Sequence, residues 1–328
     1  MGFVDAATYR ISDDGTITGY GYVGSTELLK LIVWRPDGSV EVHEIGGAEG
    51  SVTTGVTRSD GVIFGEYQGG PGGLDPFILN IDGPDELPGA FAGAHGGMRD
   101  VSAGGLVTGR WFEKSFLFDA KPFIWAAAPR GRGAFVVLPT PPGLQYGWGM
   151  RIDDFGRVAG SGQMVSKDPF QAHWQAFYCE NGAYTMLGTL PGDLNSRVRD
   201  ANSVGQVVGQ SSLLGSSNGL PFLWQHGVMV PLSSLVTLPG IHYPRLVSAV
   251  NDKGTIAVNS ISKMFIMRPL GVVPSDIDLN CKVNVDDLKL LLECWGDAAT
   301  SPVKHADING DGFVNASDLS ELLGAWTP

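Results

Sequence analysis

The feature of this sequence that most constrains its fold is a five-residue pattern, Gly-x-(Ile/Val)-x-Gly, that recurs along most of the chain. In the sixth copy Val258 replaces the last glycine. A period of this length is typical of stacked supersecondary units, so the chain is predicted to be an array of similar repeats. The first glycines of the copies, 44 to 51 residues apart, are Gly15, Gly61, Gly105, Gly156, Gly205 and Gly254.

A second element follows each copy of the pattern, as a short apolar run that ends in turn residues. Asn181-Gly182 is a two-residue hairpin signal, so each run is predicted to be one arm of a β-hairpin. Each period then supplies four strands, one on each side of the glycine turn and two in the hairpin. The runs begin at Leu31, Pro76, Pro122, Ala176, Pro221 and Met264.

Four antiparallel strands in a period of about 50 residues are typical of one blade of a β-propeller. We therefore expect a mainly β fold, a propeller of about six four-stranded blades, over residues 1–271. Only Val272 and Val273 separate Gly271 from the acidic segment that follows, so the last blade is expected to lack its outer strand. Residues 1–5 offer only a poor closing strand, so either the ring is closed loosely or the native chain begins upstream of Met1.

Composition agrees with a turn-rich β fold that carries an acidic appendage. The 47 glycines and 20 prolines among 328 residues argue against a mainly helical chain. Residues 274–328 hold ten acidic residues and three lysines, a net charge of −7, so the other residues carry −5 of the total −12. The acidic segment suggests a cation site, and the lack of a basic patch argues against nucleic acid or an anionic membrane as partner.

Three cysteines are too few for a disulfide framework. Cys179 aligns with Trp34 and Trp224 in the repeats and is expected in the core, whereas Cys281 and Cys294 could form a local disulfide or remain two thiols. The sequence contains no apolar run long enough for a membrane span, and its first residues show no signal peptide.

The fifth repeat carries a specific family resemblance. Its segments LGTLPG (187–192), NSVGQVVG (202–209) and PFLW (221–224) resemble the bacterial extracellular HAF repeats, and weaker similarity extends from Ala6 to Leu270. Every copy lacks the histidine of the HAF tripeptide. The resemblance implies an exported β-repeat protein, located outside the cell or on its surface.

Two segments at the C-terminus, residues 276–287 and 307–318, align residue for residue. Oxygen-bearing side chains occupy positions 1, 3, 5, 9 and 12 in both, and position 7 offers a backbone carbonyl, which is the ligand spacing of a 12-residue calcium loop. Two Ca²⁺ ions are expected, with weaker binding in the first loop because Cys281 replaces the position-6 glycine, Gly312. The expected ligands are Asp276, Asp278, Asn280, Lys282, Asn284, Asp287, Asp307, Asn309, Asp311, Phe313, Asn315 and Asp318.

Each loop precedes a short helical pattern with an apolar stripe, and the two stripes are expected to pack on each other. They comprise Leu288, Leu291, Leu292 and Trp295, and Leu319, Leu322, Leu323 and Trp326. The duplicated loop and helix, from Asp276 to Trp326 within a module at 272–328, resembles a type I dockerin. That resemblance implies calcium-dependent docking to a cohesin-like or other cell-surface protein. Its partner-reading positions correspond to Val285, Asp286, Ala316 and Ser317.

No catalytic residue is predicted in the repeats. The six histidines show no metal-ligand spacing, and turn acids such as Asp13, Asp14, Asp153, Asp154 and Asp252 suit turn geometry, although two could meet as an acid/base pair. The in-register Trp34, Trp125 and Trp224 are expected in the core, whereas off-register tryptophans could pack in loops or line an exposed face. The off-register tryptophans are Trp111, Trp148 and Trp174.

These observations favour an exported, non-enzymatic β-propeller protein with a calcium-dependent dockerin-like anchoring module. The alternative is a protein that binds or degrades polysaccharide, with a glycan at the propeller and glycoside chemistry if it is an enzyme. A third hypothesis is an interaction scaffold that uses one propeller face.

Overall fold

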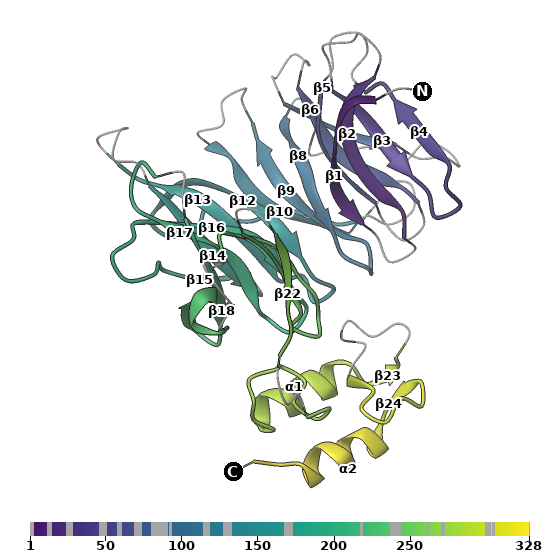
Figure 1. Ribbon diagram of the computed structural model, residues 1–328, viewed down its shortest axis with the longest axis vertical. Helices are drawn as coiled ribbons and strands as arrows, with labels where there is room; N and C mark the ends of the chain where they lie inside the picture. The colour runs from purple at the N-terminus through teal and green to yellow at the C-terminus, as the bar shows by residue number, and fades with distance from the viewer. Residues whose placement is uncertain are drawn as a thin grey trace. The chain divides into compact units, whose positions relative to one another are not determined.

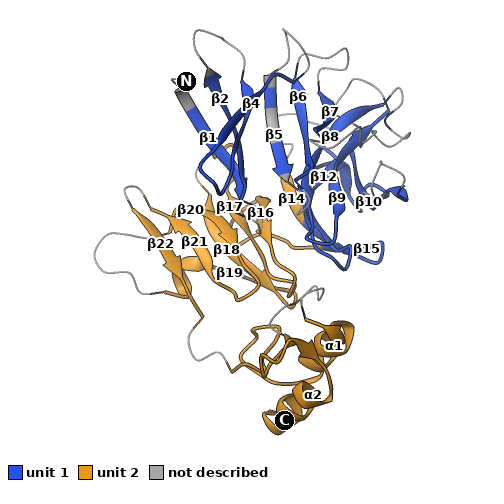
Figure 2. Ribbon diagram, turned by 90° about the vertical axis from the view of Figure 1, so that its right-hand side faces the viewer, with its two compact units in different colours: residues 1–172, 177–185 blue, residues 173–176, 186–328 orange. Residues whose placement is uncertain are grey.

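The computed structural model divides into two compact units, residues 1–172 with 177–185 and residues 173–176 with 186–328 (Figure 2). The residues that the structure describes are 3–11, 15–23, 29–45, 51–57, 61–68, 74–79, 91, 94–113, 119–126, 133–166, 173–216, 219–236, 244–260, 263–269, 273–298, 303 and 306–327.

Six antiparallel sheets follow one another along the chain, and in each of them every strand pairs with the next strand in sequence (Figure 1). Four sheets have four described strands. The first has β1 (Phe3–Ile11), β2 (Ile17–Val23), β3 (Lys30–Trp34) and β4 (Val40–His43), and the third has β8 (His95–Val101), β9 (Leu106–Phe112), β10 (Lys121–Ala126) and β11 (Phe135–Val137). The fourth has β12 (Leu144–Ile152), β13 (Val158–Met164), β14 (Trp174–Glu180) and β15 (Ala183–Met186), and the fifth has β16 (Asn195–Ala201), β17 (Val207–Ser212), β18 (Leu220–Gln225) and β19 (Val228–Pro231).

The second and sixth sheets have three strands each among the described residues. The last described strand of the sixth sheet ends at Met267, and the prediction that the last blade lacks its outer strand or takes it from elsewhere stays a prediction. The strands are β5 (Ser51–Thr57), β6 (Ile63–Gln68) and β7 (Asp75–Leu79), then β20 (Leu246–Val250), β21 (Ile256–Asn259) and β22 (Met264–Met267), and a 3-10 helix, η6 (Leu232–Ser234), follows β19. The predicted mainly β, six-bladed propeller is confirmed.

The two glycines of the repeated pattern have different physical roles. The first lies in the left-handed region in all six copies, with φ between +67° and +88°, where a side chain would strain the turn. The second lies against a β-bulge: at Gly209 an added Cβ would be 2.1 Å from the carbonyl oxygen of Arg197. The register shifts between Val198 and Asp200, directly after the residue that pairs with Gly209. The pattern therefore encodes a tight turn followed by a close backbone approach.

Neighbouring sheets pack on each other through apolar side chains. A cluster containing Phe64, Met98 and Trp125 joins the second and third sheets, and one containing Val208, Val247 and Ile256 joins the fifth and sixth. The expected core positions of Trp125, Trp224 and Cys179 are confirmed, since the three are at most 7% exposed. The aliphatic and aromatic residues of the strands thus supply the core that a single blade could not form alone.

The turn acids bind backbone amides of the turns. Asp154 accepts a hydrogen bond from the Gly104 amide at 2.6 Å, and Asp252 accepts one from the Ser203 amide at 2.8 Å, which ties each turn to the next repeat. Asp153 accepts bonds from within its own turn, including one from the Phe155 amide. These contacts favour the turn role over an acid/base pair, while Asp13 and Asp14 lie outside the described residues.

Two short helices follow the sheets, α1 (Val285–Glu293) and α2 (Ala316–Gly324), with a small ladder of β23 (Gly296–Asp297) and β24 (Phe313–Val314). Each helix begins with a capping box, formed by Asn284 with Asp287 and by Asn315 with Asp318. In the described parts of the chain, no helix is long and apolar enough to cross a membrane.

Replacing Gly209 with alanine should destabilise the fifth sheet. The new Cβ would overlap the Arg197 carbonyl and lie 2.6 Å from the Phe222 ring, so we expect a loss of roughly 3 kcal/mol in the free energy of unfolding of the propeller. Gly324→Ala is the control, because no atom lies within 4 Å of that position. Thermal melting checks this, and equal melting of the Gly209 variant and the wild type would contradict it.

Candidate metal centre

The two predicted calcium loops have the same internal hydrogen bonds. In the first, the Asp276 carboxylate accepts from the amides of Asn280 and Cys281, both at 2.9 Å. In the second, the Asp307 carboxylate accepts from the corresponding amides, those of Asp311 at 3.1 Å and Gly312 at 2.9 Å. The position-1 side chain is therefore oriented in both loops by the backbone that follows it.

The position-12 carboxylates close the loops. Asp287 accepts hydrogen bonds from the amides of Asp278 at 3.0 Å and Asn284 at 2.8 Å. Asp318 does the same in the second loop, with the Asn315 amide at 2.8 Å. Both side chains are 0% exposed. Each carboxylate thus caps its helix and holds the two ends of its loop together.

Three buried carboxylates converge in the first loop. Ligand oxygens of Asp276, Asp278 and Asp287 lie within 4.8 Å of one another. Burial, together with the charges of Asp287 and Asp278, raises the pKa of Asp276 to about 6, and burial also raises the pKa of Asp287. Mutually repelling, buried acids at this spacing fit a hard divalent cation such as Ca²⁺, which would neutralise them.

The remaining predicted ligands lie beside these carboxylates. The Asn280 amide donates to Asp278 at 2.8 Å in the first loop, and Asn284 caps α1. In the second loop the Asn309 amide donates to Asp311 at 3.2 Å. The Asn315 amide donates to the Phe313 carbonyl at 3.3 Å. Positions 7 and 9 of the second loop are thus bonded to each other, and the role of each of the twelve residues as a ligand stays a prediction.

The first loop carries backbone strain that the second avoids. Leu279 and Cys281 have φ of +61° and +65°, where the second loop has Gly310 and Gly312. A residue other than glycine in this conformation costs about 1 to 2 kcal/mol, so the predicted strain at Cys281 is present. Of the two alternatives for these cysteines, the structure has two thiols with no disulfide between them: Cys281 is exposed and Cys294 is buried.

The predicted packing of the two apolar stripes is wrong in part. Leu291 and Leu322 are 0% exposed, but Leu292, Leu323 and Trp295 are between 48% and 53% exposed. The reason is that aliphatic side chains from outside the helices share the small core with one residue of each predicted stripe. The buried residues outside the stripes are Ile277, Val283, Leu290, Cys294, Val303, Ala306 and Val314.

Residues 274–324 match the family model of the Dockerin type I domain. The C-terminal module is a type I dockerin domain. Type I dockerins bind calcium, which agrees with the three carboxylates that converge in the first loop. The four predicted partner-reading residues, Val285, Asp286, Ala316 and Ser317, are exposed at the first turns of α1 and α2.

About four fifths of the chain is similar to several solved structures at low identity. One is a prolyl endopeptidase (12% identity, TM-score 0.49), with 82% of this chain and 43% of that chain covered. A streptogramin B lyase has 12% identity and a TM-score of 0.45, with 82% and 85% covered. An acylaminoacyl peptidase of Pyrococcus horikoshii has 14% identity and a TM-score of 0.46, with 80% and 44% covered.

The chain therefore spans less than half the length of the two peptidases. No curated protein matches it. The resemblance of the repeats to the HAF family stays a prediction.

The off-register tryptophans are half-buried: Trp111 packs against the core cluster of the second and third sheets, and Trp174 lies under the guanidinium of Arg197, 4.3 Å from its ring centre. Trp148 lies beside Tyr146 in a stacked arrangement. Of the two alternatives for these residues, packing inside the sheets and loops fits better than an exposed aromatic face.

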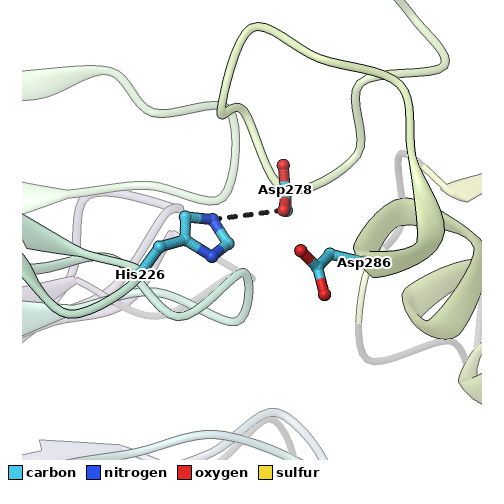
Figure 3. Close-up of side chains that lie close together, drawn as sticks. All are labelled: His226, Asp278 and Asp286. Carbon is cyan, nitrogen blue, oxygen red and sulfur yellow. Dashed lines mark ion pairs between the residues drawn. The ribbon is translucent and has the colours of Figure 1, made fainter. Parts of the chain in front are cut away.

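Sequence reasoning missed one residue beside the first calcium loop. His226, in the turn between β18 and β19, has its Nε2 3.1 Å from Oδ2 of Asp278, and Asp286 completes the group (Figure 3). The hydrogen bond to Asp278 and the charges of Asp278 and Asp286 raise the pKa of His226. No spacing rule could have found this contact, because 52 residues separate His226 from Asp278.

Calcium binding by the first loop should weaken in acid. Because Asp276 holds a proton up to about pH 6 in the folded loop, calcium must displace that proton below this pH, and the affinity should fall about fivefold between pH 6 and pH 5. In chelator the sign is opposite: the folded module binds more protons than the unfolded one, so its stability should fall as the pH rises from about 4 to about 6.

Calorimetric titration of the full chain with calcium at pH 5, 6 and 7 measures the first effect. Asp276→Asn is the control, since its weaker binding should show a flatter pH profile. Equal pH dependence in the wild type and this variant would contradict the assignment.

Proposed function

We propose that this chain is an exported, non-enzymatic β-propeller protein that its dockerin attaches to a cohesin-type partner when calcium fills both loops. In this proposal the propeller comprises residues 1–271 and the module residues 272–328. The observation that carries the proposal is the pair of exposed apolar rows on α1 and α2, which the calcium loops position.

These rows lie at matching places on the two helices. Val285, Leu292 and Trp295 of the first half are between 48% and 64% exposed. On the second half, Leu323 and Trp326 are 53% and 38% exposed. Contiguous apolar side chains on a soluble module mark a surface that a partner covers. The match to a docking domain supports a cohesin as that partner.

The surface of α1 beside its apolar row also contains a depression. A shallow depression of about 370 Å³ is lined by Val285, Leu288, Leu292 and the side chains of Lys289 and Glu293. An apolar floor with charged groups at its rim suits a protein side chain, with the rim charges setting orientation.

The buried charges of the propeller support a structural role for that part. The Glu66 carboxylate is 0% exposed and lies 2.7 Å from both Arg99 and Arg110. Asp153 pairs with Arg157 at 2.6 Å. Acids neutralised by arginine in this way hold neighbouring strands and turns together and are poor general acids or bases.

Calcium removal should unfold the module and spare the propeller. Each bound ion at a hundredfold excess over its dissociation constant stabilises the folded module by about 2.7 kcal/mol, and chelator removes that contribution. Melting of the full chain, followed by the helical circular dichroism of α1 and α2, should shift to lower temperature in chelator. The β-sheet transition serves as the internal control, and an unchanged helical transition would refute the calcium proposal.

Docking should depend on the exposed leucines. Leu323→Ala is expected to weaken calcium-dependent binding to a type I cohesin roughly tenfold or more, because it removes an apolar contact at the centre of the surface. Leu322→Ala is the matched control. Leu322 is the neighbour of Leu323 in sequence but is 0% exposed, so this variant should lower the melting temperature instead.

Surface plasmon resonance against a panel of type I cohesin domains, in calcium and in chelator, measures this effect. If no cohesin binds the wild type in calcium, the docking proposal fails.

A further inference from the structure

We propose that the first calcium loop docks onto the fifth and sixth blades of its own chain, so that calcium in this loop fixes the dockerin to the propeller. The proposal rests on calcium binding by the first loop. Both partners in the contact belong to the same compact unit, residues 173–176 and 186–328.

The fifth sheet reaches the loop through the turn between β18 and β19. The Gln225 side-chain amide donates to the backbone carbonyl of Asp278, and His226 Nε2 lies 3.1 Å from the Asp278 carboxylate. Gln225 is itself held by Gln206, whose amide donates to it at 3.1 Å. Asp278, at position 3 of the loop, is thus bound through its backbone by Gln225 and through its side chain by His226, and Figure 3 shows the second of these contacts.

The sixth sheet receives the next residue of the loop. The Leu279 side chain lies over Gly254: a Cβ at Gly254 would be 2.9 Å from Leu279 Cδ1 and 2.9 Å from Pro269 Cγ. The glycine of the sixth turn therefore leaves space that the end of this leucine side chain occupies.

The two loops differ where this contact is made. Leu279 holds a strained left-handed conformation, whereas the second loop has Gly310 there, with no atom within 4 Å of its added Cβ. Asp278 is 1% exposed, whereas the residues at positions 3 and 5 of the second loop, Asn309 and Asp311, are exposed. Since the two loops share their internal hydrogen bonds, the blades account for the extra burial. Backbone strain that persists at such a contact points to a function for it.

Calcium should control this docking because the contact residues belong to the metal loop. Without a cation, the carboxylates of Asp276, Asp278 and Asp287 repel one another, and the loop cannot hold Asp278 and Leu279 in place. Leu292 and Leu323, which belong to the exposed apolar rows, are not the residues that contact the blades, Asp278 and Leu279. These exposed leucines therefore stay available to a partner in the docked module, while Asp286, one of the predicted partner-reading residues, lies beside His226 and Asp278.

Hydrogen exchange of the full chain, with calcium and with chelator, tests the proposal. Chelator should speed exchange of the amides at 225–228 and around Gly254 roughly tenfold, the factor expected for losing a hydrogen bond to a charged group. The amides of β17, inside the same sheet, should not change. If chelator leaves the 225–228 amides unchanged, or speeds β17 equally, the docking is refuted.

Two variants distinguish loss of the contact between the β18–β19 turn and Asp278 from a general loss of folding. In Gln225→Ala/His226→Asn, which keeps a residue that tolerates the left-handed turn, exchange at 227–228 should be the same with and without calcium. Asn181→His is the matched control, because Asn181 occupies the same turn of the fourth sheet with φ of +50° against +51° for His226. This control should keep the wild-type response to chelator.

Leu279→Gly gives a second, independent variant. It removes the strain and the contact together, so the first loop should still bind calcium while the coupling to Gly254 is lost. Calorimetry on the same samples counts the ions. If the first loop of the wild type binds calcium but the amides near Gly254 do not respond to chelator, the docking proposal fails and calcium binding stands. If the first loop binds no calcium, both the docking proposal and the calcium proposal fail for this loop.

Discussion

The β-bulge in the first strand of each sheet is the constraint on which the repeat array depends. In five of the six sheets it lies directly after the residue that pairs with the last position of the repeated pattern. The bulge brings two backbones close together, and glycine occupies the facing position of the second strand in four of these five sheets, while Val258 stands there in the sixth. The bulge also frees a carboxylate for the next repeat: Asp100 binds the Ile152 amide at 2.9 Å, and Asp200 binds the Val250 amide at 2.8 Å. The β-bulge therefore shapes each of these sheets, and the carboxylate beside it links the third and fifth sheets to the sheet that follows.

The dockerin relies on different physics. Its core is small, and its two loops concentrate acids that destabilise the fold until a cation neutralises them. Asp287 and Asp318 each have two structural roles, because each carboxylate caps a helix and closes a loop. The blades, in contrast, are held by apolar packing and by hydrogen bonds of the turns.

Much of this could be predicted from the sequence because the signals are local and repeated. The glycine spacing predicted six blades, and the alignment of 276–287 with 307–318 predicted both loops and the left-handed strain at Cys281. The helix faces could not be predicted as well. Periodicity marked Leu292 and Leu323 as apolar, but it could not tell that Ile277 and Val314 would fill the core instead. Hydrophobic pattern identifies a face; which neighbour covers it depends on distant residues.

The sequence by itself determined the number of repeats, the turn that opens each one and the ligand spacing of the calcium loops, because each depends on residues within a few positions of one another. Only the tertiary structure decided that His226 and Gly254 lie against the first loop, that Asp278 is buried while its counterpart Asn309 is exposed, and that one row of leucines remains uncovered. These features depend on contacts between segments tens of residues apart, and such contacts leave no periodic trace in the chain.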